Sequence, residues 1–379
     1  MLKFIYGVSV ISGTIIGIGL FALPYIAMKA GFFVVLGYFF ILFPVAVIVH
    51  YFFAELALNT PDFKRLPGFV KIYLGKKTEK FSQIVIIFAL SGTLLAYIIL
   101  GGEFLYQLFS PVFSGSSFFY TTLYFLIGSL VIFFGIKAIA KVEFFGLILF
   151  FLILLFVFIK GFPYWEIENL LVKTGGAKDF FLPYGVILFS LWGAVIIPEV
   201  EETLGEEKEK LRKIVPVAVL IPALVSIIFI LIIFGITGSF TSESALAGLR
   251  SIFGNGAVSA TLFLGVLTTF TSFIVLGLTL KKVLWYDMGL PKNLSWAIAC
   301  FSPYFLYIIG LKNFIAVIGA VGAIMWAMEA ILINLMYRKF SIQSPEKIRY
   351  PKLKSLVFPI IVFFLLGIFF EIYYFFNQA

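Results

Sequence analysis

Long runs of apolar residues, separated by short polar stretches, make up most of the chain. The runs are continuous over about 20 residues and do not alternate between apolar and polar positions, which is typical of membrane-spanning helices and not of barrel strands. With 62% hydrophobic and 12% charged residues, the composition excludes an ordinary soluble fold. We therefore predict an all-α polytopic membrane protein with eleven transmembrane helices, at about 4–29, 32–58, 81–109, 117–139, 142–161, 183–203, 214–237, 256–280, 293–310, 313–337 and 355–376.

Basic residues are distributed unevenly among the loops between these helices. If the N-terminus lies in the cytoplasm, 22 of the 28 Lys and Arg residues fall on the cytoplasmic side, and the other side holds Lys29, Lys160, Lys173, Lys178, Arg250 and Lys312. Because cytoplasmic loops carry the excess of positive charge, we predict a multi-pass protein of the cell membrane (plasma or inner) with a cytoplasmic N-terminus and an extracytoplasmic C-terminus. The same asymmetry explains the net charge of +9, so the lipid bilayer, and not a nucleic acid, is the expected partner.

Two of the predicted spans contain residues that interrupt helices. The first holds "SGTIIGIGLFALPY" (12–25), with three glycines and a proline; in a helix interior, glycine costs about 1 kcal/mol and proline about 3 kcal/mol relative to alanine. The sixth holds "LPYGVILFSLWGAVIIPEVEE" (182–202), in which the segment from Ser190 to Gly193 reads as a break before Pro198. We predict that helices 1 and 6 are both discontinuous.

The two interrupted spans are related by a constant offset. Gly19 and Pro24 are five residues apart, as are Gly193 and Pro198, and 174 residues separate the two pairs. The same offset places the third, fourth and fifth spans on the eighth, ninth and tenth. Because five is odd, the second copy enters the bilayer inverted, and paired broken helices in such a repeat indicate the binding site of a transporter. The predicted organisation is a first repeat at 1–161, an outer loop at 162–182, a second repeat at 183–337, a cytoplasmic loop at 338–354 and the extra eleventh helix at 355–379.

A second outer loop, 238–255, carries a short helical pattern that begins at Ser242 and ends at "GNG" (254–256). Such a helix either lies over the outer mouth of the site or is a plain surface helix.

The breaks expose peptide groups that the bilayer cannot satisfy, at a cost of several kcal/mol for each group. The amides of Gly17, Ile18 and Gly19 would lie at the positive end of the second half-helix, which suits a carboxylate. Carbonyls before the first break, with those of Phe189, Ser190 and Trp192 in the sixth span, suit an ammonium group. An amino acid carries both charges; the alternative is that these glycines only allow close helix packing.

At these residues the chain resembles the amino acid–polyamine–organocation superfamily, which has the LeuT-type fold. The segment "GTIIGIGLFALPYIAMKAG" is most similar to the hydroxy/aromatic amino acid permeases and the amino acid/auxin permeases, and "LPYGVILFSLWGAVIIPE" and "TTFTSFIVLGLTL" are similar to their sixth and eighth spans. The resemblance implies secondary active transport by alternating access. It also implies a substrate site made of Thr14, Gly17, Ile18, Gly19, Phe189, Ser190 and Trp192, although Trp192 could equally be an ordinary interior residue.

The resemblance further implies a cation site. Three hydroxyl residues share one face of the eighth span, in a spacing like that of the superfamily's second sodium site, and carbonyls of the first span would complete it. The implied Na⁺ ligands are Gly13, Ile16, Thr268, Thr271 and Ser272. The alternative is that the hydroxyls bond to their own helix, and proton-coupled relatives can keep similar hydroxyls.

Acidic residues within the spans are candidates for proton transfer. Glu199 and Glu329 are the best candidates for a proton relay. His50, the single histidine, could titrate near neutral pH, but we expect it to make a structural hydrogen bond.

The predicted function is a symporter of aromatic or large neutral amino acids, coupled to Na⁺ or H⁺. One alternative is a nutrient sensor of the same fold. A lipid-modifying enzyme is less favoured, because the sequence has no paired carboxylate motif, no phosphate loop and no Ser/His/Asp set. We expect no enzymatic activity, no cofactor other than Na⁺, and no obligatory protein partner.

Overall fold

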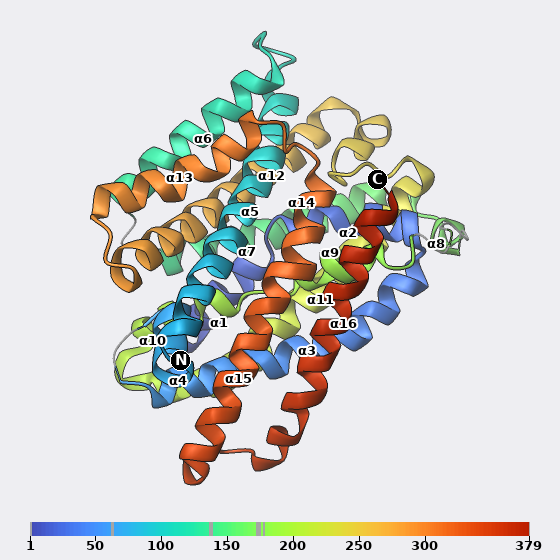
Figure 1. Ribbon diagram of the computed structural model, residues 1–379. Coiled ribbons are helices and arrows are strands. Elements are labelled where there is room, and N and C mark those ends of the chain that lie inside the picture. The colour runs from blue at the N-terminus through green and yellow to red at the C-terminus, as the bar shows by residue number, and fades with distance from the viewer. Residues whose placement is uncertain (1, 62–63, 136–138, 172–175, 177–178, 379) are drawn as a thin grey trace.

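The computed structural model of the protein describes residues 2–61, 64–135, 139–171, 176 and 179–378. Within these ranges the chain forms helices, turns and connecting segments, and no β-strand (Figure 1). The α-helices are α1 (Leu2–Ile15), α2 (Gly19–Ala30), α3 (Phe32–Asn59), α4 (Leu66–Leu74), α5 (Lys76–Phe109), α6 (Ser117–Phe134), α7 (Ile139–Gly161), α8 (Ile167–Leu171), α9 (Leu182–Ser190), α10 (Ile197–Leu204), α11 (Leu211–Thr237), α12 (Arg250–Lys282), α13 (Lys292–Ile308), α14 (Phe314–Ala320), α15 (Ala327–Gln343) and α16 (Val357–Gln378).

These helices occupy the ranges expected of membrane spans. In the described residues, eight helical stretches are long and apolar enough to cross a bilayer, and the bent pair of α1 and α2 makes nine. One of the eight, 182–240, contains both the sixth and the seventh predicted spans, whereas α13, with 17 residues, is short for a span. The protein is thus a multi-pass membrane protein, and the number of eleven crossings stays a prediction.

The predicted interruptions of helices 1 and 6 are confirmed. α1 ends at Ile15 and α2 begins at Gly19, with an angle of 48° between the two. α9 ends at Ser190, and a 3-10 turn over Ala194–Ile196 leads into α10. Glycine lies at both breaks, where the absence of a Cβ allows another segment of the chain to approach closely.

The tenth span is irregular in a different way. A π-helical turn, Val321–Trp326, separates α14 from α15. Here the backbones of the tenth span and α9 are in direct contact, since a Cβ placed on Gly322 would overlap the carbonyl of Gly185. This close packing brings the start of α15 beside the break in helix 6.

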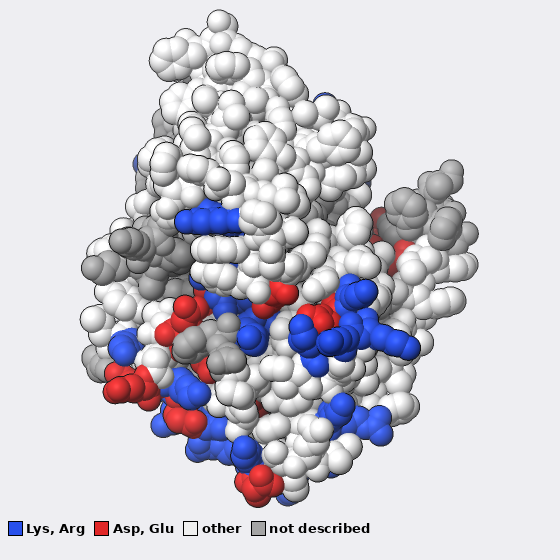
Figure 2. All heavy atoms as spheres, turned by 60° about the vertical axis from the view of Figure 1, so that its left-hand side comes forward, with Lys and Arg blue, Asp and Glu red and all other residues white. Residues whose placement is uncertain are grey.

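On one face of the helical bundle, charged side chains are concentrated at one end (Figure 2). In Figure 1, the N-terminus lies beside α4 and α10 at the lower end, with the turn between α15 and α16, and the C-terminus lies at the upper end near α8. Figure 2 shows Lys, Arg, Asp and Glu side chains gathered over the lower end, while the upper part of that face is almost free of them.

Two predicted helix boundaries are wrong. The short helix expected from Ser242 is absent: a 3-10 turn over Ala247–Leu249 leads into α12, which begins at Arg250 and continues through "GNG". Ala245 has a φ of 58°, which breaks any helix there, and the Ser242 hydroxyl accepts a hydrogen bond from the Gly248 amide instead. The fourth span, expected to reach 139, ends at Phe134 because Gly135 adopts a φ of 78°; residues 136–138 lie outside the described ranges.

Candidate substrate site

The breaks in helices 1 and 6 face each other in the interior. A Cβ added to Gly19 would lie 2.5 Å from the Ser190 Oγ and 2.8 Å from the Phe189 Cδ1. A Cβ added to Gly193 would lie 2.5 Å from the Ile15 Cγ1. At both positions a Cβ would force neighbouring atoms to shift, so glycine allows the two interrupted backbones to meet closely.

The first break leaves backbone amides without partners. The amides of Gly17 and Gly19 have no hydrogen-bond acceptor among the described residues, whereas the Ile18 amide donates to the Tyr97 hydroxyl at 3.2 Å. These amides lie at the start of α2, at the positive end of its dipole, where a carboxylate is stabilised. The three predicted carboxylate-binding residues therefore lie together.

Tyr97, in α5, is a site residue that the sequence reasoning did not identify. It is 1% exposed, and a Cβ on Gly17 would overlap its hydroxyl, so the ring closes directly over the break. In the sequence, Tyr97 is marked only as an aromatic residue with a hydroxyl in the third predicted span, one helical turn after Thr93.

The side-chain hydroxyls at the two breaks bond to their own helices, so the second break offers main-chain carbonyls to a ligand. The Ser190 hydroxyl donates to the Val186 carbonyl at 2.7 Å, and the Thr14 hydroxyl donates to the Val10 carbonyl at 2.8 Å. The main-chain carbonyls of Ser190 and Trp192 accept no hydrogen bond from the described part of the chain. They are free to accept from an ammonium group.

His50, in α3, completes the backbone at the second break. Its Nε2 accepts a hydrogen bond from the Gly193 amide at 2.9 Å, and its Nδ1 donates to the Ala46 carbonyl at 2.7 Å. An Nε2 that accepts from an amide carries no proton, so this pattern requires the neutral imidazole. The expected structural hydrogen bond of His50 is confirmed.

We expect replacement of His50 with leucine to destabilise the protein, because the Gly193 amide would lose its acceptor in a buried, apolar place. Such a loss costs about 1–3 kcal/mol. His50→Gln keeps an acceptor and should lose clearly less. The apparent melting temperature of the purified protein in detergent checks this, and equal losses for the two variants would contradict it.

A small cavity lies between the two breaks. Its lining includes six of the predicted substrate residues, all but Ser190. The others are Ile15 of α1, Thr93 and Tyr97 of α5, Val195 of the 3-10 turn in helix 6, Leu276 of α12 and Trp326 of the tenth span. The cavity has a volume of about 20 Å³, room for one water molecule. An amino acid would therefore bind only after the surrounding side chains or half-helices move apart.

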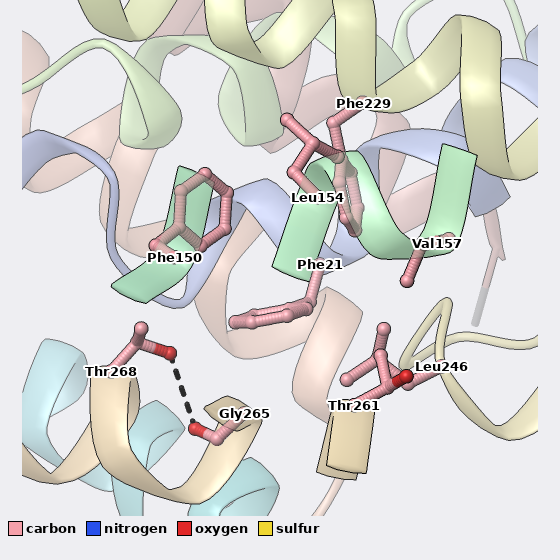
Figure 3. A pocket seen from close by; sticks show the side chains of 9 residues that line it. All are labelled: Phe21, Phe150, Leu154, Val157, Phe229, Leu246, Thr261, Gly265 and Thr268. Atoms are coloured by element: carbon pink, nitrogen blue, oxygen red, sulfur yellow. Dashed lines mark hydrogen bonds between the residues drawn. The ribbon is translucent and has the colours of Figure 1, made fainter. Parts of the chain in front are cut away.

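The predicted cation ligands lie on α12 and at the end of α1, two helices that contact each other. Thr268 and Thr271 donate to carbonyls of their own helix, at 3.3 Å to Gly265 and 3.1 Å to Thr268. Figure 3 shows the Thr268 hydroxyl turned toward Gly265 at the edge of a second, mainly apolar cavity. Ser272 is buried. A hydroxyl that donates a hydrogen bond keeps its lone pairs, so these neutral oxygens still fit the chemistry of a Na⁺ site.

The two acidic candidates lie in opposite environments. Glu199, in α10, pairs with Arg65 at 2.7 Å and with Lys282 at 2.5 Å. Glu329, in α15, is fully buried; its Oε2 accepts a hydrogen bond from the Trp192 Nε1 at 2.7 Å, and its Oε1 has no partner in the described residues. Only Glu329 adjoins the cavity, through the Trp192 ring that lines it.

Two broken helices that meet through their glycines define the LeuT-type transporter fold, and solved structures agree. The chain matches MhsT in complex with L-phenylalanine with a TM-score of 0.73 and 15% identity, over 99% of this chain and 98% of that chain. It matches Mhp1, a nucleobase-cation-symport-1 family transporter with bromovinylhydantoin bound, with a TM-score of 0.72 and 10% identity, over 98% and 91%. It also matches a manganese transporter of Eremococcus coleocola with a TM-score of 0.69 and 13% identity, over 100% and 88%. At these identities the likeness shows the fold.

The family follows from the sequence itself. The model of the tryptophan/tyrosine permease family matches residues 1–373, so the chain belongs to that family and is a membrane transporter. No curated protein sequence matches it. The recognition of an aromatic amino acid permease in the superfamily with the LeuT-type fold is confirmed.

Proposed function

We propose that the protein is a symporter of aromatic or large neutral amino acids, which works by alternating access and uses a Na⁺ or H⁺ gradient. The observation that carries this proposal is the meeting of two broken helices. Among the described residues, the amides of Gly17 and Gly19 and the carbonyls of Ser190 and Trp192 at these breaks have no hydrogen-bond partner. The carboxylate of an amino acid would accept hydrogen bonds from these amides, and its ammonium group would donate to these carbonyls, without a buried charged side chain in the protein.

The surroundings of the cavity favour an aromatic substrate. Phe189, Trp192, Trp326 and Tyr97 line it, and aromatic side chains pack favourably against each other at centroid distances of 4.5–7 Å. The permease family and the phenylalanine bound to MhsT point to the same class of substrate. In this proposal Thr14, Ile18 and Phe189 complete the substrate site, and Gly13, Ile16, Thr268, Thr271 and Ser272 would hold Na⁺ if that is the coupling ion.

The proposed orientation has the N-terminus in the cytoplasm and the C-terminus outside. The gathering of charged side chains at the end that holds the N-terminus, α4 and α10 supports it (Figure 2), because the excess of basic residues marks the cytoplasmic side. The proposed repeats are 1–161 and 183–337.

Uptake into proteoliposomes tests the proposal. Purified protein is reconstituted, and accumulation of labelled tryptophan, tyrosine, phenylalanine and leucine is measured with a Na⁺ gradient, a pH gradient, or neither. Concentrative uptake of at least one aromatic amino acid, driven by one of the gradients, is expected. Binding without any uptake would favour the sensor of the same fold, and neither binding nor uptake of any amino acid would overturn the proposal.

A further inference from the structure

We propose that Glu329 is the residue that carries the proton in the coupled transport cycle, and that Trp192 links this carboxyl to the substrate cavity. The inference rests on the proposed transport function, with H⁺ as the coupling ion, and names the side chain that carries the proton.

Glu329 is isolated from every positive charge in the described residues. Its side chain is 0% exposed, none of the ion pairs includes it, and its hydrogen bond from Trp192 leaves one oxygen without a partner. An ionised carboxylate in such a place, without a cation, costs far more than a neutral one. A proton on the free Oε1 removes that cost, so this side chain suits the binding and release of a proton.

The neighbouring titratable groups do not compete for this role. α15 packs against α3, α4, α5 and α16 and follows the π-helical turn of the tenth span. On α3, His50 bonds to backbone groups and Glu55 pairs with Arg212. On α4, Lys71 pairs with Glu79, and the Tyr73 hydroxyl shares a hydrogen bond with Thr60. On α5, the Tyr97 hydroxyl accepts a hydrogen bond from the Ile18 amide. Tyr337, about two helical turns after Glu329 on α15, has a buried hydroxyl without a partner among the described residues. Glu371 of α16 lies near Gly319, which precedes the π-helical turn.

Trp192 connects the carboxyl to the substrate. Its ring lies at the second break, lines the cavity, and is held between His50, at 5.1 Å, and Trp326, at 6.3 Å. Among the described residues, the Trp192 Nε1–H is the group that donates a hydrogen bond to the Glu329 carboxyl. A charged carboxylate holds this N–H more strongly than a protonated carboxyl does, so adding the proton loosens the ring that closes the cavity.

The π-helical turn gives this pair its geometry. It ends at Trp326, and Glu329 follows three residues later on the same face of the helix. A π-helical turn is frequent at functional sites because its wider spacing re-aims side chains. Here it lets Trp326 line the cavity while Glu329 reaches the edge of Trp192.

The transport cycle balances in protons. From the outward-facing state, one proton from outside joins the Glu329 carboxylate and an amino acid enters the cavity. After the protein turns inward, the amino acid leaves and the carboxyl releases the same proton to the cytoplasm. The unloaded protein then returns with a charged carboxylate held by Trp192.

Glu329→Gln tests the proposal, because it keeps the shape and the acceptor for Trp192 but cannot take up a proton. One unit of pH gradient is worth about 1.4 kcal/mol per proton, or about tenfold accumulation. We expect wild-type proteoliposomes to reach that ratio with a pH gradient and no Na⁺, and the variant to stop at an equal concentration on both sides. Exchange of labelled for unlabelled substrate should persist in the variant, because exchange needs no net proton movement.

Two further variants keep the test decisive. Glu371→Gln removes an acid of the neighbouring helix and should leave the tenfold accumulation unchanged. Trp192→Phe keeps a ring but removes the N–H that favours the charged carboxyl, so the midpoint of the pH dependence of uptake should move to higher pH. Proton-driven accumulation by Glu329→Gln, or accumulation driven by Na⁺ alone in the wild type, would overturn the proposal. Failure of the wild type to take up any amino acid would instead overturn the proposed function.

Discussion

Replacement of Gly19 with leucine is expected to abolish binding of an aromatic amino acid while the protein still folds and inserts. Gly19 begins α2 and faces the second break, so an added Cβ would lie 2.5 Å from the Ser190 Oγ and 3.1 Å from the Ser190 Cα. The rest of a leucine side chain would fill a cavity that has room for only one water molecule. Both the amide of Gly19 and the carbonyls opposite would become inaccessible to a substrate.

Loss of helix stability is not an alternative explanation for this effect. Leucine is a better helix former than glycine by roughly 0.8 kcal/mol, and position 19 is the first residue of α2. Gly19→Ala adds the Cβ alone and should weaken binding by an intermediate amount. The measurement is binding of labelled tryptophan to purified protein, with monodispersity in detergent as the check of folding.

Gly37→Leu is the matched control. Gly37 lies in α3, and a Cβ added there meets no atom within 4 Å. The control should bind tryptophan as the wild type does. If Gly19→Leu also binds with unchanged affinity, the substrate site lies elsewhere in the protein.

The breaks could be predicted from the sequence because their cause is local. Glycine and proline change the cost of a helix wherever they occur, and in a bilayer a freed peptide group must have a partner. The segments 12–25 and 182–202 therefore predict both discontinuities, which the structure contains.

The partners of those breaks could not be predicted, because they come from distant parts of the chain. Tyr97 meets Ile18 across 79 residues, and His50 meets Gly193 across 143. Each of these contacts depends on how helices pack, and a single sequence carries no signal for it. The same holds for Trp192 and Glu329, which are 137 residues apart.

The wrong boundary at Ser242 has a related cause. Apolar residues at helical spacing predict a helix, but the left-handed backbone of Ala245 and the hydroxyl of Ser242 form a turn there instead. A side chain that bonds to the backbone competes with a helix, and in a loop that covers a packed core the turn prevails.

Removal of the Arg65 side chain is expected to open the end of the protein that holds the N-terminus, which is the cytoplasmic end in the proposed orientation. Arg65 follows α3 and is 2% exposed; its guanidinium binds Glu199 at 2.7 Å and Glu202 at 3.0 Å, both in α10. Lys282, at the end of α12, binds the other oxygen of Glu199. This cluster ties the inner half of helix 6 to α12 and to the segment before α4.

The expected effect is large because the arginine is buried. Arg65→Ala removes charge-assisted hydrogen bonds to two carboxylates, each worth about 1.5–3 kcal/mol. Glu199 keeps Lys282 as its partner, but even 1.4 kcal/mol changes the ratio of two conformations tenfold. Arg65→Ala should therefore favour an inward-open state and slow the full transport cycle, which needs the closed state as well.

Labelling of a single cysteine measures this opening. Val195 lies in the 3-10 turn of helix 6 and lines the cavity, so Val195→Cys reports access to the site. The native Cys300 is 0% exposed and contributes little background. With a membrane-impermeant maleimide added to the cytoplasmic side, Val195→Cys should react at least about tenfold faster when Arg65 is alanine, in line with a shift of 1.4 kcal/mol or more.

Arg212→Ala separates opening from general instability. Arg212 is also an arginine with a buried carboxylate partner, Glu55 at 2.7 Å, but it joins α3 to α11 and does not touch α10. Both variants should lose stability, whereas only Arg65→Ala should expose Val195→Cys from the cytoplasm. Equal labelling rates in the two backgrounds would mean that the cluster around Glu199 holds the fold together and does not control access to the site.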